Sequence, residues 1–253
     1  MLKRTVGLLV VALALFSVPI ALSQMESAQP VYTYVSQFQV PRANWAQFAE
    51  DNDKTFVPIA EKLMADGTLV SWSTFETIVH TPDGFTHGSA WSSNSIAGLA
   101  RVLDELRKGG PRPGQIASTR HEDLLMQSTM YHASTVAPSS GYLRVVCQMA
   151  KPDKPGDYAA VLKKYLVPTF EDLFKKGVAT YYGLDEQYVN NAPPSLRCLV
   201  ITYPNAESMD KWATAINATL ARMSPADRDA FTGATVPDSR RDFMARITRY
   251  AHK

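Results

Sequence analysis

The sequence contains few of the residues that most often mark a metal or catalytic site. Only two cysteines, Cys147 and Cys198, occur in 253 residues, and they do not have CxxC spacing. No two of the five histidines stand four residues apart, as a helical metal site requires. Nucleophile elbows, phosphate loops and dinucleotide fingerprints are also missing. The sequence therefore predicts no metal and no cofactor.

The sequence also lacks an excess of charge. It has 26 basic and 24 acidic residues, and two of the basic ones, Lys3 and Arg4, lie in a segment that we expect to be removed. A nucleic-acid-binding surface needs a basic footprint, so we expect no nucleic-acid partner. The lysine pairs at 163–164 and 175–176 are typical of the solvated face of one helix.

Long apolar runs are missing except at the N-terminus, where residues 6–22 follow two basic residues. Ala21 and Ser23 put small residues at the positions that a signal peptidase requires. This pattern predicts a signal peptide over residues 1–23 and an exported protein, periplasmic or secreted, that leaves the membrane after cleavage. The alternative is an uncleaved anchor. The short run, interrupted by Pro19, disfavours it.

One segment of the chain occurs twice. Residues 56–63, FVPIAEKL, followed by Gly67, return at an offset of 110 as residues 166–173, LVPTFEDL, followed by Gly177. An internal repeat implies two copies of one supersecondary unit, most simply packed together as a built-in dimer. A proline stands inside each copy of the predicted helix, where it removes a hydrogen bond and should kink or split the helix.

Each copy shows the same order of elements. Strand composition and helical spacing of apolar residues predict strand-helix-strand-strand-helix-strand, the ferredoxin-like order. In the first copy the strands cover 31–40, 68–79, 85–91 and 124–131, and the helices cover 45–63 and 96–106, the second with Ile96, Leu99, Leu103 and Leu106 as its apolar face. In the second copy the strands cover 142–149, 178–184, 196–203 and 242–250, and the helices cover 158–174 and 206–220, with a short extra helix after Ser224.

The domain organisation follows from this repeat. We expect a first module over residues 31–132, a linker over 133–141 and a second module over 142–253. A four-stranded sheet with helices on one face leaves its other face uncovered, and two such sheets can cover each other. The predicted fold is therefore α+β, a tandem of two ferredoxin-like modules that forms an intramolecular, pseudo-dimeric α+β barrel.

This pattern resembles the dimeric α+β barrel superfamily, with two subunits fused in one chain. The resemblance rests on the element order, the duplication, and a Val-Pro then Gly signature at Val57-Pro58 with Gly67 and again at 167–168 with Gly177. It covers residues 31–252. The superfamily includes cofactor-independent monooxygenases, haem-degrading enzymes and stress-response barrels, so the resemblance implies a fold more than a function.

The tandem arrangement also resembles the chlorite dismutase-like haem proteins. That resemblance would imply an axial histidine in the second half. Residues 133–251 contain no histidine, and His252 is next to last in the sequence. Haem binding is therefore kept only as a second, disfavoured alternative.

Four aromatic residues occupy matched strand positions in the two copies. Trp72 aligns with Tyr182 and Trp91 aligns with Tyr203. Amphipathic aromatics at such positions could line two related binding clefts. Ordinary core packing explains the same pattern and is the favoured alternative.

Two charged or titratable strand residues are further candidates. His87 is in phase with Trp91 on a predicted strand, so a pocket imidazole could act as acid, base or ligand contact. A hydrogen-bonded structural histidine is the commoner outcome. Arg144 could bind an anionic ligand, although a strand arginine more often pairs with a neighbouring carboxylate. His80 and His121 are expected to be exposed.

The two cysteines lie on strands that should be antiparallel neighbours. Pairing Cys147 with Cys198 also pairs Tyr142 with Tyr203, so the two strands match end to end. We therefore expect the cysteines to face each other. A disulfide and a pair of free buried thiols both remain open.

The leading hypothesis is an exported protein that binds a small, partly apolar molecule between helices and sheet. By analogy with the superfamily, cofactor-free oxygenase-like chemistry is the first enzymatic hypothesis, and the competing class is a non-catalytic structural or interaction module. The sequence names no ligand and leaves oligomerisation beyond the pseudo-dimer open. Since the histidines cluster in the first copy, we expect the site there.

Overall fold

The computed structural model describes residues 29–110, 112–134, 140–151, 153, 155–189 and 195–253. The predicted signal peptide and most of the predicted linker lie outside these ranges. Within them, no helix is both long enough and apolar enough to cross a membrane.

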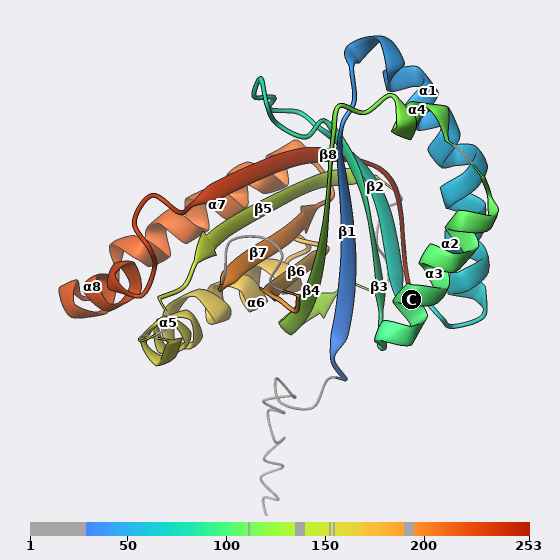
Figure 1. Ribbon diagram of the computed structural model, residues 1–253. Coiled ribbons are helices and arrows are strands. Elements are labelled where there is room, and N and C mark those ends of the chain that lie inside the picture. The colour runs from blue at the N-terminus through green and yellow to red at the C-terminus, as the bar shows by residue number, and fades with distance from the viewer. Residues whose placement is uncertain (1–28, 111, 135–139, 152, 154, 190–194) are drawn as a thin grey trace, which may run out of the picture.

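Eight antiparallel strands close into a barrel in the order β1-β3-β2-β8-β5-β7-β6-β4 (Figure 1). Strands β1 to β4 form one continuous run of this order and β5 to β8 form the other. We call these runs, with the helices between their strands, the first half and the second half. The predicted α+β class and barrel are confirmed. The strands are β1 (Val31–Gln39), β2 (Ser71–Thr77), β3 (His87–Ser93), β4 (Arg120–Ala133), β5 (Gly141–Met149), β6 (Tyr181–Gln187), β7 (Leu196–Tyr203) and β8 (Arg241–His252).

The helices lie outside the barrel, those of the two halves on opposite sides (Figure 1). The first half carries a 3-10 turn (Arg42–Asn44), α1 (Trp45–Asp51), a π turn (Asn52–Phe56), α2 (Val57–Ala65), α3 (Ile96–Lys108) and α4 (Pro113–Ile116). The second half carries α5 (Pro155–Val161), a π turn (Leu162–Leu166), α6 (Val167–Lys175), α7 (Ala206–Ala221) and α8 (Pro225–Gly233). The short helix α4, which packs on α1, was not predicted.

The two prolines widen their helices instead of breaking them. Val57 N–H bonds to the carbonyl of Asn52, and Val167 N–H bonds to that of Leu162, so each helix takes one π turn just before its proline. A proline has no N–H group, so it cannot bond to the carbonyl four residues earlier. The wider π turn accommodates this missing hydrogen bond, and the helix continues. The predicted irregularity at each proline therefore takes the form of a π turn in both halves.

Side-chain caps fix the starts of three helices. Ser95, Asn205 and Ser224 each accept a hydrogen bond from a backbone N–H in the first turn of α3, α7 and α8. The predicted apolar face of α3 is partly wrong. Val102 is buried on it, whereas Ile96, in the first turn, is 37% exposed.

Strands β5 and β7 pair in the predicted register. Cys147 lies opposite Cys198, Tyr142 opposite Tyr203, and Met149 opposite Leu196. The two cysteine sulfurs are joined by a disulfide bond.

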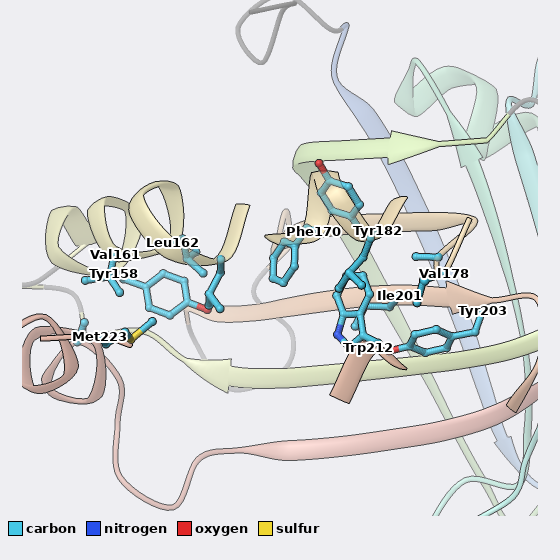
Figure 2. Packing of buried hydrophobic residues seen from close by; sticks show 14 residues of the cluster. Tyr158, Val161, Leu162, Phe170, Val178, Tyr182, Ile201, Tyr203, Trp212 and Met223 are labelled. Carbon is cyan, nitrogen blue, oxygen red and sulfur yellow. The ribbon is translucent and has the colours of Figure 1, made fainter. Parts of the chain in front are cut away.

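Apolar side chains fill three layers. The barrel interior is packed by a cluster that draws on both halves, built around Phe75, Leu143, Ala245 and Ile247. A second cluster lies between the first-half sheet and its helices, and includes Phe56, Trp72 and Trp91. The third, between the second-half sheet and its helices, includes Phe170, Tyr182 and Trp212 (Figure 2). The outer layers are where a ligand site between helices and sheet would lie.

Candidate functional site

The outer layer of the first half is a continuous set of aromatic rings. Trp72 on β2 lies opposite Trp91 on β3. Phe56, in the π turn, contacts both indoles, with ring centroids 5.8 and 5.7 Å away. Tyr34 on β1 stacks on Trp91 at 4.8 Å with an interplanar angle of 17°. Alternation along the strands directs these side chains to the helix-covered face.

Both indole N–H groups in this layer are buried without an acceptor. Trp72 is 4% exposed and Trp91 is 2% exposed, and neither Nε1 has a hydrogen-bond partner among the described residues. Leaving a buried donor unpaired costs about 1–3 kcal/mol. Such a cost calls for an explanation, and a bound acceptor is one.

A polar cluster interrupts the aromatic layer beside Tyr34. The Ser36 hydroxyl donates to Asp123 Oδ1 at 2.7 Å and lies 2.9 Å from His121 Nε2. The same Nε2 lies 2.9 Å from Asp123 Oδ1. Ser36 is buried, whereas the side chains of His121 and Asp123 are 46% and 34% exposed. The cluster therefore joins the buried layer to solvent.

These three residues do not form a hydrolase triad. In a triad the carboxylate orients the imidazole through Nδ1, and Nε2 takes the serine proton. Here Ser36 and Asp123 both meet Nε2, and the serine hydroxyl proton points at the carboxylate. The arrangement can accept or hand on a proton, but it does not activate the serine as a nucleophile.

Tyr34 links the aromatic layer to this cluster. Burial, and then a hydrogen bond to Asp123, raise the pKa of Tyr34 well above its usual range. The phenol is therefore protonated at physiological pH, stacked on Trp91 and hydrogen-bonded to Asp123.

His87 shares the helix-covered face with Trp91 but packs as a structural histidine. It contacts Trp45 and Phe48, with ring centroids 5.1 and 4.9 Å away, and its Nδ1 lies 3.0 Å from Thr86 Oγ1. Burial, helped by the nearby His80, lowers the pKa of His87 to about 4. The imidazole is neutral at physiological pH.

The second-half candidates have partners of their own. The Tyr182 hydroxyl donates to Glu171, which His132 Nδ1 also meets at 3.0 Å. Tyr203 packs edge-to-face on Trp212 at 5.9 Å (Figure 2). Arg144 pairs with a strand neighbour, Asp242, at 2.8 Å, the commoner arrangement named for a strand arginine.

Of the predicted site residues, the structure brings together Trp72 and Trp91, with His87 farther along the same face. The other three, Arg144, Tyr182 and Tyr203, lie in the second half. Sequence reasoning missed Tyr34, Ser36, His121 and Asp123. A signal was present in the sequence. The last strands of the two copies, Asp123-Leu124-Leu125 and Asp242-Phe243-Met244, match at an offset of 119 residues, which aligns Asp123 with Asp242. His121 was expected just before a strand, but it lies within β4. Its side chain is exposed, as expected, at 46%.

Neither a family model nor a curated protein matches this sequence. Solved structures do match. A candidate monooxygenase from Fusobacterium nucleatum subsp. nucleatum is 12% identical with a TM-score of 0.65, over 89% of this chain and 95% of that one. An anthrone oxidase-like protein is 9% identical with a TM-score of 0.54, over 90% and 94%. A candidate chlorite dismutase is 11% identical with a TM-score of 0.53, over 87% and 96%.

The likeness to a chlorite dismutase raises the question of haem, and the residues of the second half do not fit it. Residues 133–251 provide no histidine ligand, and His252 ends β8 opposite Ser71 of the first half. The outer layer of the second half is packed by rings, with Phe170 stacked on Trp212 at 5.1 Å. No step of the mechanism below uses haem. At these identities the matches establish the fold alone: this chain has the dimeric α+β barrel fold.

Proposed function

We propose that the chain is an exported, tandem pseudo-dimer of two ferredoxin-like modules. Three matched features support a duplication. The π turns lie 110 residues apart, as do the sequence repeats. The pairing of β4 with β6 shifts at Thr129, and that of β8 with β2 shifts at Thr248, 119 residues later. The strands of each half pair in the same order.

We further propose that the first half binds a small, partly apolar molecule that carries an oxygen acceptor, and acts on it as an oxygenase. The observation that carries this proposal is the pair of unpartnered indole N–H groups of Trp72 and Trp91. Two neutral donors in an aromatic layer suit a carbonyl or phenolic oxygen on a flat ring system. The matched residue Tyr182 in the second half already donates to Glu171.

The polar cluster supplies the chemistry that such a ligand needs. Asp123 and His121 stand beside Tyr34 and reach solvent, so they can receive a proton from an acidic C–H or O–H of the ligand. The resulting carbanion or phenolate is electron-rich and reacts with O2. Two of the matched proteins, a candidate monooxygenase and an anthrone oxidase-like protein, have names that agree with this reaction class.

Anthrone is a suitable probe because it combines a carbonyl acceptor with an acidic CH2 group on three fused rings. In its oxidation the CH2 group loses both hydrogens, one oxygen atom of O2 becomes the new carbonyl, and the other leaves as water. Oxygen uptake should be faster with the wild-type protein than in buffer. Trp91→Phe keeps the ring and removes the donor, and should slow the protein-dependent rate about tenfold, the value of one hydrogen bond.

The matched control is Tyr203→Phe, which removes a polar atom at the corresponding position of the second half. It should leave the rate unchanged. Equal losses in the two variants, or a wild-type rate no faster than buffer, would contradict the proposal. The alternative is a non-catalytic module. It predicts that oxygen uptake with wild type is no faster than in buffer, and that anthrone does not quench the tryptophan fluorescence.

A further inference from the structure

The disulfide belongs to a row of residues that crosses four strands of the barrel. Ser128 on β4 lies opposite Asp185 on β6, Asp185 opposite Cys198 on β7, and Cys198 opposite Cys147 on β5. Val145 and Val200, two residues from each cysteine, pack in the interior cluster. Because side chains alternate along a strand, the whole row faces the barrel interior.

Asp185 is a buried acid that accepts a hydrogen bond from Ser128. Its residue is 6% exposed, and its Oδ1 accepts a hydrogen bond of 2.8 Å from Ser128. No cation pairs with it among the described residues. The other titratable groups that face it are the neutral hydroxyls of Tyr181, and beyond it of Tyr131 and Tyr250.

The fold does not need an acid at this place. By the offsets of 110 and 119, the residues that match Asp185 and Ser128 are Phe75 and Ile247. These two also lie opposite each other, across the other junction between the halves, and both are apolar and buried. An unpaired buried carboxyl group costs stability that the apolar pair avoids. Its presence beside the disulfide therefore calls for a chemical explanation.

The two cysteine residues differ in burial. Cys198 is buried, at 4% exposed, and lies directly opposite Asp185, whereas Cys147 is only partly buried. Directly opposed residues of neighbouring strands hold their Cβ atoms about 4.5–5.5 Å apart. The Asp185 side chain therefore lies in the row between Ser128, which donates to its Oδ1, and Cys198. A reductant would reach Cys147 first, and the leaving sulfur would be that of Cys198.

We propose that Cys147 and Cys198 form a redox-active disulfide that exchanges with a dithiol, and that Asp185 is the general acid for the departing Cys198 thiolate. A thiolate of the dithiol attacks Cys147 Sγ, a mixed disulfide forms, and the bond to Cys198 breaks. Cys198 takes the Asp185 proton. The second thiolate of the dithiol then displaces Cys147, and the dithiol leaves as its own disulfide. Cys147 and Asp185 regain protons from water.

The protonation of Asp185 gives the reaction its pH dependence. Burial raises the pKa of Asp185 to about 6, while the bond from Ser128 lowers it. Below that pH the carboxyl group can donate a proton to the thiolate. Above it, the carboxylate would repel the thiolate that forms beside it.

The test is the rate of reduction of the folded protein by dithiothreitol, measured by mass after thiol trapping, at pH 5 and at pH 8. Wild type is compared with Asp185→Asn at each pH, so that the titration of the reductant cancels. We expect wild type to react about tenfold faster than Asp185→Asn at pH 5, and no faster at pH 8. Glu186→Gln is the matched control: Glu186 is the next residue on β6, pairs with Arg197 on the outer face, and should leave both rates unchanged.

Two results would overturn the proposal. One is a folded protein whose disulfide resists dithiothreitol at both pH values, as an inert structural cystine would. The other is a ratio between wild type and Asp185→Asn that is the same at both pH values. Ser128→Ala provides a second variant should Asp185→Asn fail to fold. Losing the serine hydroxyl raises the pKa of Asp185, so the acid-assisted rate should persist to higher pH than in wild type.

Discussion

The same carboxylate position serves different purposes in the two halves. In the first half Asp123 is surrounded by the hydroxyls of Tyr34 and Ser36 and by the imidazole of His121. In the second half Asp242 is held by the guanidinium groups of Arg144 and Arg240. Hydroxyls and imidazole exchange protons, whereas arginine stays charged at any physiological pH. At matched positions, the carboxylate thus lies among hydroxyl and imidazole groups in the first half and in an ion pair in the second.

The contrast extends to the buried titratable groups, whose pKa values shift in opposite directions in the two halves. The first half buries a neutral imidazole, His87, and the second half buries a carboxyl group, Asp185. Because each group is buried in its uncharged form, acid should destabilise the first half and alkali the second. Fold symmetry therefore says little about which half does what.

The largest expected effect concerns the second-half layer. Phe170 is 1% exposed and contacts Tyr182 and Trp212. Phe170→Ala should lower the free energy of unfolding by about 3–5 kcal/mol, because it removes a buried ring and leaves a cavity. Urea denaturation measures this. A loss below about 1 kcal/mol would contradict the close packing of Phe170 described for this layer.

Asp185→Asn should stabilise the protein at pH 8 by about 2–3 kcal/mol. The folded-state pKa near 6 lies above the ordinary value of 3.8, so wild type is most stable relative to the variant below pH 3.8 and loses stability as the pH rises to 6. Urea titrations at pH 3.5 and pH 8 should show the difference at the higher pH alone. If the two proteins differed in unfolding free energy by the same amount at both pH values, the cause would be altered packing and not the ionisation of Asp185.

Wild type should lose about 2 kcal/mol of unfolding free energy between pH 7 and pH 4.5 because His87 becomes protonated, and His87→Leu should not show this loss. The pKa of His87 is lowered to about 4, so the wild-type histidine contributes its full stability above pH 6.5 and loses it as the pH falls through 6.5 toward 4. The measurement is thermal or urea unfolding of both proteins at pH 7 and pH 4.5. If both lose the same stability, His87 is not the buried neutral group described here.

The smallest effect tests the two matched carboxylates. Asp242→Asn should lower the free energy of unfolding by less than about 1 kcal/mol. The reason is that its ion pair with Arg144 is partly exposed, with side-chain exposures of 37% for Asp242 and 29% for Arg144. This variant should leave oxygen uptake with anthrone unchanged. Asp123→Asn should cost a similar amount of stability and reduce the uptake. Equal rates in the two variants would remove the functional difference between them.

Much of the fold could be predicted because it rests on local patterns. The Val-Pro repeat marked the two helix positions where the π turns occur, and the spacing of apolar residues predicted α3 and α7. Matching two strands end to end predicted that Cys147 lies opposite Cys198. The candidate site could not be predicted in the same way. Tyr34, Ser36 and Asp123 come from strands whose pairing fixes their proximity, and β1 and β4 are about 90 residues apart in the sequence. Alternation shows which face each residue occupies, but not which residue it meets there.

The closed barrel has a consequence for protein handling. Every strand is paired on both sides, and two of the junctions, β2 with β8 and β4 with β6, join the halves. A polypeptide limited to residues 29–134 would expose β2 and β4 as free edges, each with a row of unpaired backbone amides and carbonyls. Such a fragment should self-associate or aggregate on expression. The shortest useful expression unit is therefore both halves together.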